Sequence, residues 1–194
     1  MQLILASQSP QRKSLLGQLG ISFTIQPADV DESPLKNETP LAYVKRIAIA
    51  KAAAVSTANP GSVVLAADTP VIVGRRILQK PATLEEAKAM LRLQSGRRVH
   101  IPTVVAVADA SGKIHHKVVE SWIKLKRLSE AEITAYLAVV PWAHLSAAAR
   151  IENLEPFILT THGSISGIIG LPLYETTVLL ARAGIKINPF GGLE

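Results

Sequence analysis

The sequence predicts an α/β fold, because short apolar runs of strand length alternate with longer segments of helical pattern. Residues 2–6 form the first such run, and residues 9–19 follow it with Leu15, Leu16 and Leu19 on one helical face. Apolar residues make up 48% of the 194 residues and charged residues 19%, which is ordinary for a globular protein. A chain of this length suits one domain with a large core, so we expect a single domain over residues 1–194.

Turn and capping residues mark the elements that follow along the chain. Further strands are expected over residues 22–26, 62–67, 71–73, 99–108, 113–125 and 157–161. Further helices are expected over residues 39–55, 85–93, 129–139 and 172–182, and a polar loop over residues 28–38. The sequence Asp109-Ala110-Ser111-Gly112 marks a hairpin between the two longest strands, and Pro102 inside the first of them predicts a sheet edge or a bulge.

Composition excludes several classes of protein. The chain has no cysteine, which excludes disulfides, thiolate metal sites and cysteine nucleophiles, and which fits a reducing cytosol. No apolar run reaches the roughly 18 residues that span a bilayer, and the first residues lack the pattern of a signal peptide. We therefore expect a cytoplasmic protein without a membrane partner. The formal net charge of +6 fits either a polyanionic partner or a basic solvated surface.

The segment SQSPQRKSLL, residues 7–16, places a cation at the start of a helix. Ser9 is a good N-cap and Pro10 a good first helical residue, but a capping box expects Glu or Gln where Arg12 stands. The first turn already carries partial positive charge, so a cation there is unfavourable unless an anion binds. Ser7, Ser9, Arg12 and the free N–H groups thus predict a phosphate cradle. The alternative is a plain N-cap with Arg12 directed to solvent or to a nearby carboxylate.

Acidic residues gather in two places. The loop sequence DVDES holds Asp29, Asp31 and Glu32, which suit either a Mg²⁺ site or a solvated acidic loop. Asp68 and Thr69 follow the apolar run of LAADTPVIV, at a strand end of the kind where α/β sheets bind ligands. A carboxylate at the end of a buried strand is costly unless it is paired or used, although an Asx turn explains it equally well.

Two lysines have positions suited to a phosphate. Lys51 lies beside the apolar face of its predicted helix, as either a snorkelling surface residue or a point charge for a phosphate. Lys80 precedes Pro81, which favours an extended backbone and is weak evidence by itself. The histidines lack metal-ligand spacing. Taken together, these serine, arginine, lysine and carboxylate side chains suit cleavage of a phosphoanhydride, in which positioning and charge neutralisation dominate.

The chain resembles the Maf family of nucleoside triphosphate pyrophosphatases. The resemblance rests on the order and spacing of LASQSPQRKSLL, DVDES, AKA at residues 50–52, AADT, QKP, SGRR and GIIGLPLYET at residues 167–176. It implies an α/β fold built on a long mixed β-sheet flanked by helices, with a central cleft between two lobes. It also implies hydrolysis of a nucleoside triphosphate to the monophosphate and pyrophosphate, with a divalent cation, Mg²⁺ or Mn²⁺.

The resemblance also implies roles for individual residues. Glu32 and Asp68 would bind the metal, and Asp68 is the position that the family uses as proton acceptor from water. The residues that would hold phosphates are Ser7, Ser9, Arg12, Lys51 and Lys80.

Base specificity stays open between two branches of the family. The positions that help to select the base map to Gln11, Thr69 and Glu152. Thr69 resembles the dTTP/UTP branch, Glu152 resembles the 7-methyl-GTP branch, and Gln11 matches neither. A carboxylate accepts a hydrogen bond from guanine N1–H or from uracil N3–H, so Glu152 alone does not separate them. The Lys-Ala-Gly segment and the aromatic residue of dTTP-type members are replaced here by Leu145, Ser146, Ala147 and Ala149.

The main alternative is a non-catalytic module that binds a nucleotide or a nucleic acid through its positive charge. Aromatic residues make up only 4% of the chain and are not interleaved with basic residues, which argues against nucleic acid. A nucleoside triphosphate substrate is therefore the expected partner. The resemblance also suggests a homodimer, although no apolar stripe in the sequence identifies an interface.

Overall fold

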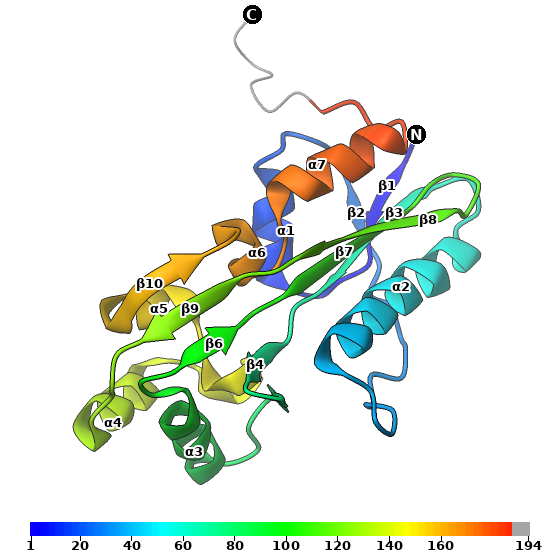
Figure 1. Ribbon diagram of the computed structural model, residues 1–194. Helices are drawn as coiled ribbons and strands as arrows, with labels where there is room; N and C mark the ends of the chain where they lie inside the picture. The colour runs from blue at the N-terminus through cyan, green and yellow to red at the C-terminus, as the bar shows by residue number, and fades with distance from the viewer. Residues whose placement is uncertain (188–194) are drawn as a thin grey trace, which may run out of the picture.

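The computed structural model describes residues 1–187 and confirms the α/β class (Figure 1). Its strands are β1 (Leu3–Leu5), β2 (Thr24–Ile25), β3 (Val63–Asp68), β4 (Val71–Val73), β5 (Arg76–Leu78), β6 (Arg98–His100), β7 (Thr103–Ala108), β8 (Ile114–Val119), β9 (Trp122–Leu125) and β10 (Ile158–His162). Its helices are α1 (Pro10–Gly17), α2 (Pro40–Ala58), α3 (Leu84–Gln94), α4 (Glu130–Val139), α5 (Ile151–Leu154), α6 (Ile165–Ile169) and α7 (Leu173–Arg182). Short 3₁₀ turns are η1 (Trp142–His144), η2 (Ser146–Ala148) and η3 (Glu155–Phe157).

The first sheet has the strand order β2-β1-β3-β7-β8 and is mixed, since β1 runs parallel to β2 and β3 while β7 and β8 are antiparallel. Helix α2 covers one face, where Ile47 packs with Ile4 and Val64. Helices α1 and α7 cover the other, where Leu16 and Leu180 pack with the alternate strand residues. Because both faces are buried, the central strands read as continuous apolar runs rather than as alternating patterns.

The second sheet has the order β10-β9-β6-β4-β5 and is antiparallel throughout. One face packs against α3 and the 3₁₀ turns, with Val99, Ile123 and Leu125 in the core. Helices α3 and α4 extend this core through Leu91 and Ile133. The sheets thus form two halves, each with its own apolar core.

The two sheets join where three strands are interrupted. The chain passes from β3 to β4 through Thr69-Pro70, from β6 to β7 through Ile101-Pro102, and from β8 to β9 through Glu120-Ser121. Proline has no N–H to donate, so the ladder cannot continue through Pro70 or Pro102, whereas the third interruption, at Glu120-Ser121, contains no proline. One bond bridges the gap, from Ile101 N to Ser121 O at 2.8 Å. The runs 99–108 and 113–125, each expected as one strand, are therefore each divided in two, and the long mixed sheet becomes two sheets.

Short elements between residues 142 and 169 escaped the sequence pattern, among them η1, η2, α5 and α6. Ala147 and Ala148 in η2 adopt left-handed backbone angles, with φ of 59° and 54°, which alanine rarely does. Buried Gln94 holds this turn, because its Nε2 donates to Ala147 O at 2.9 Å. Tertiary contacts of this kind cannot be inferred from a local pattern.

No helix within residues 1–187 is both long and apolar enough to cross a bilayer.

The acidic loop over residues 28–38 is tied to α2. Arg46 forms a two-point ion pair with Glu38, with both N···O distances at 2.7 Å, and also donates to Ser33 O at 3.0 Å. Tyr43 Oη donates to Glu32 O at 3.0 Å. These contacts fix the backbone that carries Glu32.

The Glu38–Arg46 pair predicts a pH dependence of stability. Hydrogen bonding to Arg46 lowers the pKa of Glu38 from 4.5 to about 2. The stabilisation is therefore complete above the unfolded pKa and is lost as the pH falls through the folded one. We expect Glu38→Gln to be less stable than the parent protein at neutral pH and to lose less stability on acidification toward about pH 2. Urea unfolding at a series of pH values measures this. Exposed Glu155→Gln is the control, and parallel pH profiles for Glu38→Gln and the parent protein would contradict the prediction.

Candidate active site

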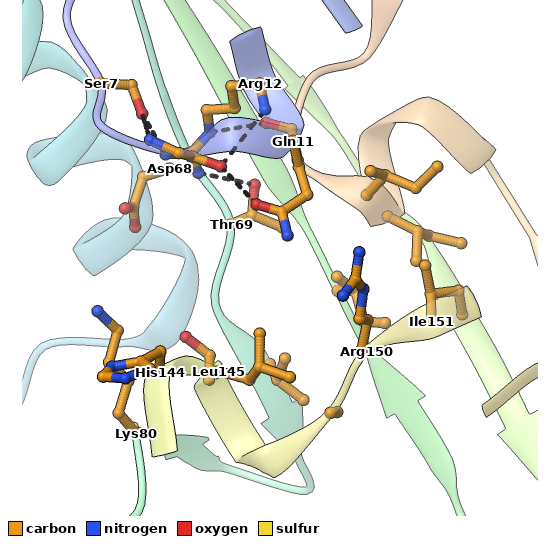
Figure 2. Close-up of a pocket in the computed structure, with 18 of the residues that line it drawn as sticks. Ser7, Gln11, Arg12, Asp68, Thr69, Lys80, His144, Leu145, Arg150 and Ile151 are labelled. Atoms are coloured by element: carbon orange, nitrogen blue, oxygen red, sulfur yellow. Dashed lines mark hydrogen bonds between the residues drawn. The ribbon is translucent and has the colours of Figure 1, made fainter. Parts of the chain in front are cut away.

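A cavity of about 600 Å³ opens where the two sheets meet (Figure 2). Its lining includes the turn after β1, the end of β3, and residues from α2, α5 and α6. Four cationic side chains and three carboxylates face it, so its charges nearly balance: Arg12, Lys51, Lys80, Arg150, Glu32, Asp68 and Glu152. The ten residues to which the family resemblance assigned a role all line this one cavity: Ser7, Ser9, Gln11, Arg12, Glu32, Lys51, Asp68, Thr69, Lys80 and Glu152.

The start of α1 shows how Arg12 is placed. Ser9 caps the helix by accepting from Arg12 N at 3.3 Å, and Pro10 is the first helical residue. The Arg12 side chain turns away from solvent and donates to Gly170 O at 2.9 Å from Nε. Its terminal nitrogens donate to Ser7 Oγ and Thr69 Oγ1, each at 3.3 Å. Ser9 therefore acts as an ordinary N-cap, while the Arg12 side chain is held inside the protein and is not directed to solvent.

Three fixed bonds leave Arg12 with spare donors. A guanidinium has five N–H groups, so after these contacts each terminal nitrogen keeps one N–H, and Arg12 lines the cavity. Burial lowers the pKa of Arg12, and the nearby carboxylates of Asp68 and Glu32 oppose that shift. An arginine remains protonated under these conditions. The result is a rigid, charged fork whose remaining donors suit phosphate oxygens.

The Ser7 hydroxyl is poised as a donor. Its oxygen accepts from Ser9 N at 3.2 Å and from Arg12 Nη1 at 3.3 Å. A hydroxyl has two acceptor positions and one proton, so the proton of Ser7 is left to donate. Ser9 Oγ instead donates to Gln11 Oε1 at 3.1 Å, which orients the Gln11 amide at the cavity wall. Ser7 is therefore the better placed of the two serines to bind an anion.

Asp68, Lys51 and Glu32 form a compact charged cluster beside Arg12. Asp68 ends β3, and Lys51 projects from α2, which packs on that strand. Lys51 Nζ lies 3.0 Å from Asp68 Oδ1 and 2.9 Å from Glu32 Oε1. The Lys51 side chain is only 11% exposed, so it is not a snorkelling surface residue. Asp29 and Asp31 do not line the cavity; Asp31 instead accepts from Ser33 N at 2.8 Å.

The carboxylate pair is the acidic ligand set that the cavity offers to a metal. Glu32 and Asp68 share one Lys51 nitrogen, so their oxygens lie close together. Within residues 1–187 no cluster of three or more His, Asp or Glu side chains is arranged around a metal position. Two carboxylates completed by phosphate and water oxygens fit the chemistry of Mg²⁺, and not that of a metal held entirely by protein.

Side chains from the second half face this corner across the cavity (Figure 2). Lys80 and His144 lie together on one side, and Arg150 projects into the middle from the segment before α5. Arg150 Nε is buried without a hydrogen-bond partner among the described residues, and it lies 3.5 Å from Glu152 Oε2. This wall is therefore polar and able both to donate and to accept hydrogen bonds.

A family model described as "Maf-like protein" matches residues 2–183. The chain belongs to the Maf-like family. The dTTP/UTP pyrophosphatase of Cereibacter sphaeroides is 47% identical to this Maf-like chain over 189 residues, covering 96% of this chain and 97% of that protein. The nucleoside triphosphate pyrophosphatase of Ehrlichia canis is 48% identical over 183 residues, covering 93% and 95%. A solved HAM1 protein structure from Coxiella burnetii aligns with 94% of this chain and 99% of that one, at 19% identity and a TM-score of 0.46.

Some residues of this Maf-like site were missed from the sequence. Arg150 and His144 lie in a segment without a clear periodicity. Thr103 sits in an apolar strand and reads as a core residue, although its hydroxyl contacts Thr69 at 3.0 Å. Gly170 supplies a backbone carbonyl, which no side-chain pattern can reveal. The GIIGLPLYET segment was the available signal, since Gly170 lies within it.

Proposed function

We propose that this chain hydrolyses a nucleoside triphosphate to the monophosphate and pyrophosphate. The observation that carries the proposal is the meeting of Arg12, Ser7 and Lys51 with the Glu32–Asp68 pair in one cavity. Relatives at 47% and 48% identity that are named as pyrophosphatases of nucleoside triphosphates support it. The cytoplasmic location, the homodimer and the single-domain extent over 1–194, whose residues 188–194 lie outside the described range, stay predictions.

The cationic residues would position and neutralise the triphosphate. Arg12 and Ser7 line one end of the cavity, and Lys80 lines it from the other side. Glu32 and Asp68 would hold Mg²⁺ or Mn²⁺. Such an ion, when bound, supplies further charge neutralisation and lowers the pKa of a coordinated water. Lys51 would then serve as a point charge for the phosphates as well as a partner of the carboxylates.

Asp68 would be the proton acceptor. Its Oδ1 accepts from Lys51, which leaves Oδ2 to accept the proton of the attacking water. Water oxygen forms the new bond to the α-phosphorus, and the bond from that phosphorus to the bridging oxygen breaks. Pyrophosphate departs with the electron pair of the broken bond, and Arg12 stabilises the charge that develops on it.

For the base, we propose uracil and thymine. The relatives from Cereibacter sphaeroides, Sphingopyxis alaskensis and Caulobacter vibrioides are named dTTP/UTP pyrophosphatases. Glu152 would accept from the N3–H of these bases, and Arg150 beside it would donate to an adjacent carbonyl. Cytosine and adenine present the opposite pattern at that edge. The second candidate substrate is 7-methyl-GTP. Guanine also places an N–H next to a carbonyl, so its N1–H could donate to Glu152 and its carbonyl could accept from Arg150.

A substrate panel tests the proposal. Pyrophosphate release is measured with dTTP, UTP, CTP, ITP and 7-methyl-GTP in the presence of Mg²⁺ or Mn²⁺. We expect dTTP and UTP to be hydrolysed fastest, and Glu152→Ala to lower kcat/KM for these two by about tenfold or more. Exposed Glu155→Ala is the matched control. Turnover of 7-methyl-GTP with little dTTP turnover would overturn the base assignment, and salt-sensitive binding of long polyanions without turnover would favour the non-catalytic alternative.

A further inference from the structure

We propose that helix α6 and the turn after it position the phosphate-binding arginine, through two hydrogen-bond paths that end on the carbonyls of Gly167 and Gly170. Thr103 and Thr69 form the second path, which makes them positioning residues for Arg12. The inference rests on the proposed function, and it assigns a role to the GIIG part of the GIIGLPLYET segment. The paths are supported by hydrogen-bond distances, by backbone geometry and by a count of hydroxyl protons.

The first path is direct. Arg12 Nε donates to Gly170 O at 2.9 Å, which fixes the plane of the guanidinium at its inner edge. Gly170 has a φ of +138°, a conformation that residues with a side chain rarely adopt. A Cβ at this position would lie 3.6 Å from both Cγ and Nε of Arg12, in ordinary contact. The need for glycine therefore comes from the backbone angle that aims the carbonyl, and not from lack of space.

The second path runs through two threonine hydroxyls whose direction can be assigned. Thr103 Oγ1 donates its single proton to Gly167 O at 2.7 Å. In the 3.0 Å contact between the hydroxyls, Thr69 must therefore be the donor and Thr103 the acceptor. The Thr69 oxygen is left as an acceptor for Arg12 Nη2, at 3.3 Å. The order of donation is thus Arg12 to Thr69, Thr69 to Thr103, and Thr103 to Gly167.

The end of both paths is itself well anchored. Ser164 caps α6 by accepting from Gly167 N at 3.0 Å, and Ser166 Oγ accepts from Leu173 N at 3.0 Å at the start of α7. A Cβ at Gly167 would lie 3.1 Å from Ser164 Cβ, so this turn is tightly packed. Thr103 is fully buried. A buried network in which each hydroxyl has its partners is rigid, and rigidity is what a phosphate-binding fork requires.

This assignment changes the role expected for Thr69. Its only proton is committed to Thr103, so its hydroxyl cannot donate to a nucleobase. Thr69 then affects the binding of all nucleoside triphosphates equally, because it acts through Arg12. Selection of the base is left to the opposite wall of the cavity, which carries Arg150 and Glu152.

Thr103→Val tests the inference, because valine keeps the shape of threonine and removes its hydroxyl. We expect kcat/KM to fall about tenfold for every nucleotide of the panel, with their ranking unchanged and activity restored in Thr103→Ser. Thr176→Val is the matched control, since Thr176 is also fully buried but its hydroxyl has no hydrogen-bond partner among the described residues. Its activity should equal that of the parent protein. Full activity of a folded Thr103→Val would overturn the proposal.

A second variant and a second measurement distinguish failure of the positioning role from failure of the proposed hydrolytic function. Thr69→Val breaks the same path at a half-buried position that lines the cavity, and should give the same uniform loss. A changed ranking of bases would overturn the proposal. Binding of inorganic pyrophosphate, measured by calorimetry, reports Arg12 without requiring turnover. Weaker pyrophosphate binding in both variants would support the positioning role even if no nucleotide were hydrolysed. Parent-like pyrophosphate binding in both variants would overturn it.

Discussion

Asp68→Asn is expected to reduce pyrophosphate release by about 10²- to 10⁴-fold while leaving the fold intact. Asparagine matches aspartate in shape, and its amide oxygen still accepts from Lys51 Nζ, which lies 3.0 Å from Asp68 Oδ1. The second oxygen, however, becomes an NH₂ group, which cannot take a proton from water and repels a cation. Both the proposed base and one proposed metal ligand are therefore lost. Single-turnover pyrophosphate release and thermal unfolding measure the two parts of the prediction.

Asp29→Asn provides the control for this experiment. Asp29 is an exposed carboxylate in the same acidic loop as Glu32, but it does not line the cavity. The substitution removes one negative charge nearby and should leave turnover within about twofold of the parent value. If Asp68→Asn retained full activity, the assignment of the base would be wrong. If Asp29→Asn were equally impaired, the effect would come from the charge of the region and not from Asp68.

Arg12→Lys is expected to lower kcat/KM by about 10²-fold, although it keeps the charge. One ammonium cannot replace a fork that donates simultaneously to Gly170 O, Ser7 Oγ and Thr69 Oγ1. The lysine would lack the fixed position of the arginine and its two spare N–H donors. Steady-state kinetics and the affinity for inorganic pyrophosphate measure the change. Both should worsen together, because in the proposed mechanism Arg12 contacts the phosphates in the bound state and in the transition state.

Arg75→Lys is the matched control for Arg12→Lys. Arg75 is exposed in the turn between β4 and β5 and does not line the cavity. Its replacement makes the same chemical change at a distance from the site, and activity should not change. An Arg12→Lys enzyme with parent-like kcat/KM would show that charge alone is needed, and that the planar fork has no separate role.

The sequence was informative where local rules govern the structure. Ser9 and Pro10 marked the start of α1 correctly, because capping depends on residues a few positions apart. Asp68 could be placed at the end of a buried strand, because the apolar run before it is continuous. The unfavourable position of the Arg12 cation in the first helical turn could also be recognised from neighbouring residues, and Arg12 does line the cavity. Each of these inferences needed only a short window of the chain.

The remaining features depend on contacts between distant segments. Pro102 predicted an interruption, but not that two sheets would meet there with a cavity between them. Thr103 looks like a strand residue until Gly167 is placed beside it. Ala147 violates its own backbone preference because Gln94 and neighbouring contacts hold it. Such relationships arise only when the fold is complete, and no local propensity encodes them.

The bond from Arg12 to Gly170 has a consequence for how the protein is made. The two residues are 158 positions apart, so the carbonyl partner emerges in synthesis long after the arginine. Sheet pairings between β1 and β3 require far less of the chain and can form sooner. A nascent chain ending before α6 therefore lacks both carbonyls that orient the arginine. Assembly of the proposed phosphate-binding site is therefore coupled to synthesis of α6 and the turn after it, and a product truncated before them would lack the complete candidate active site.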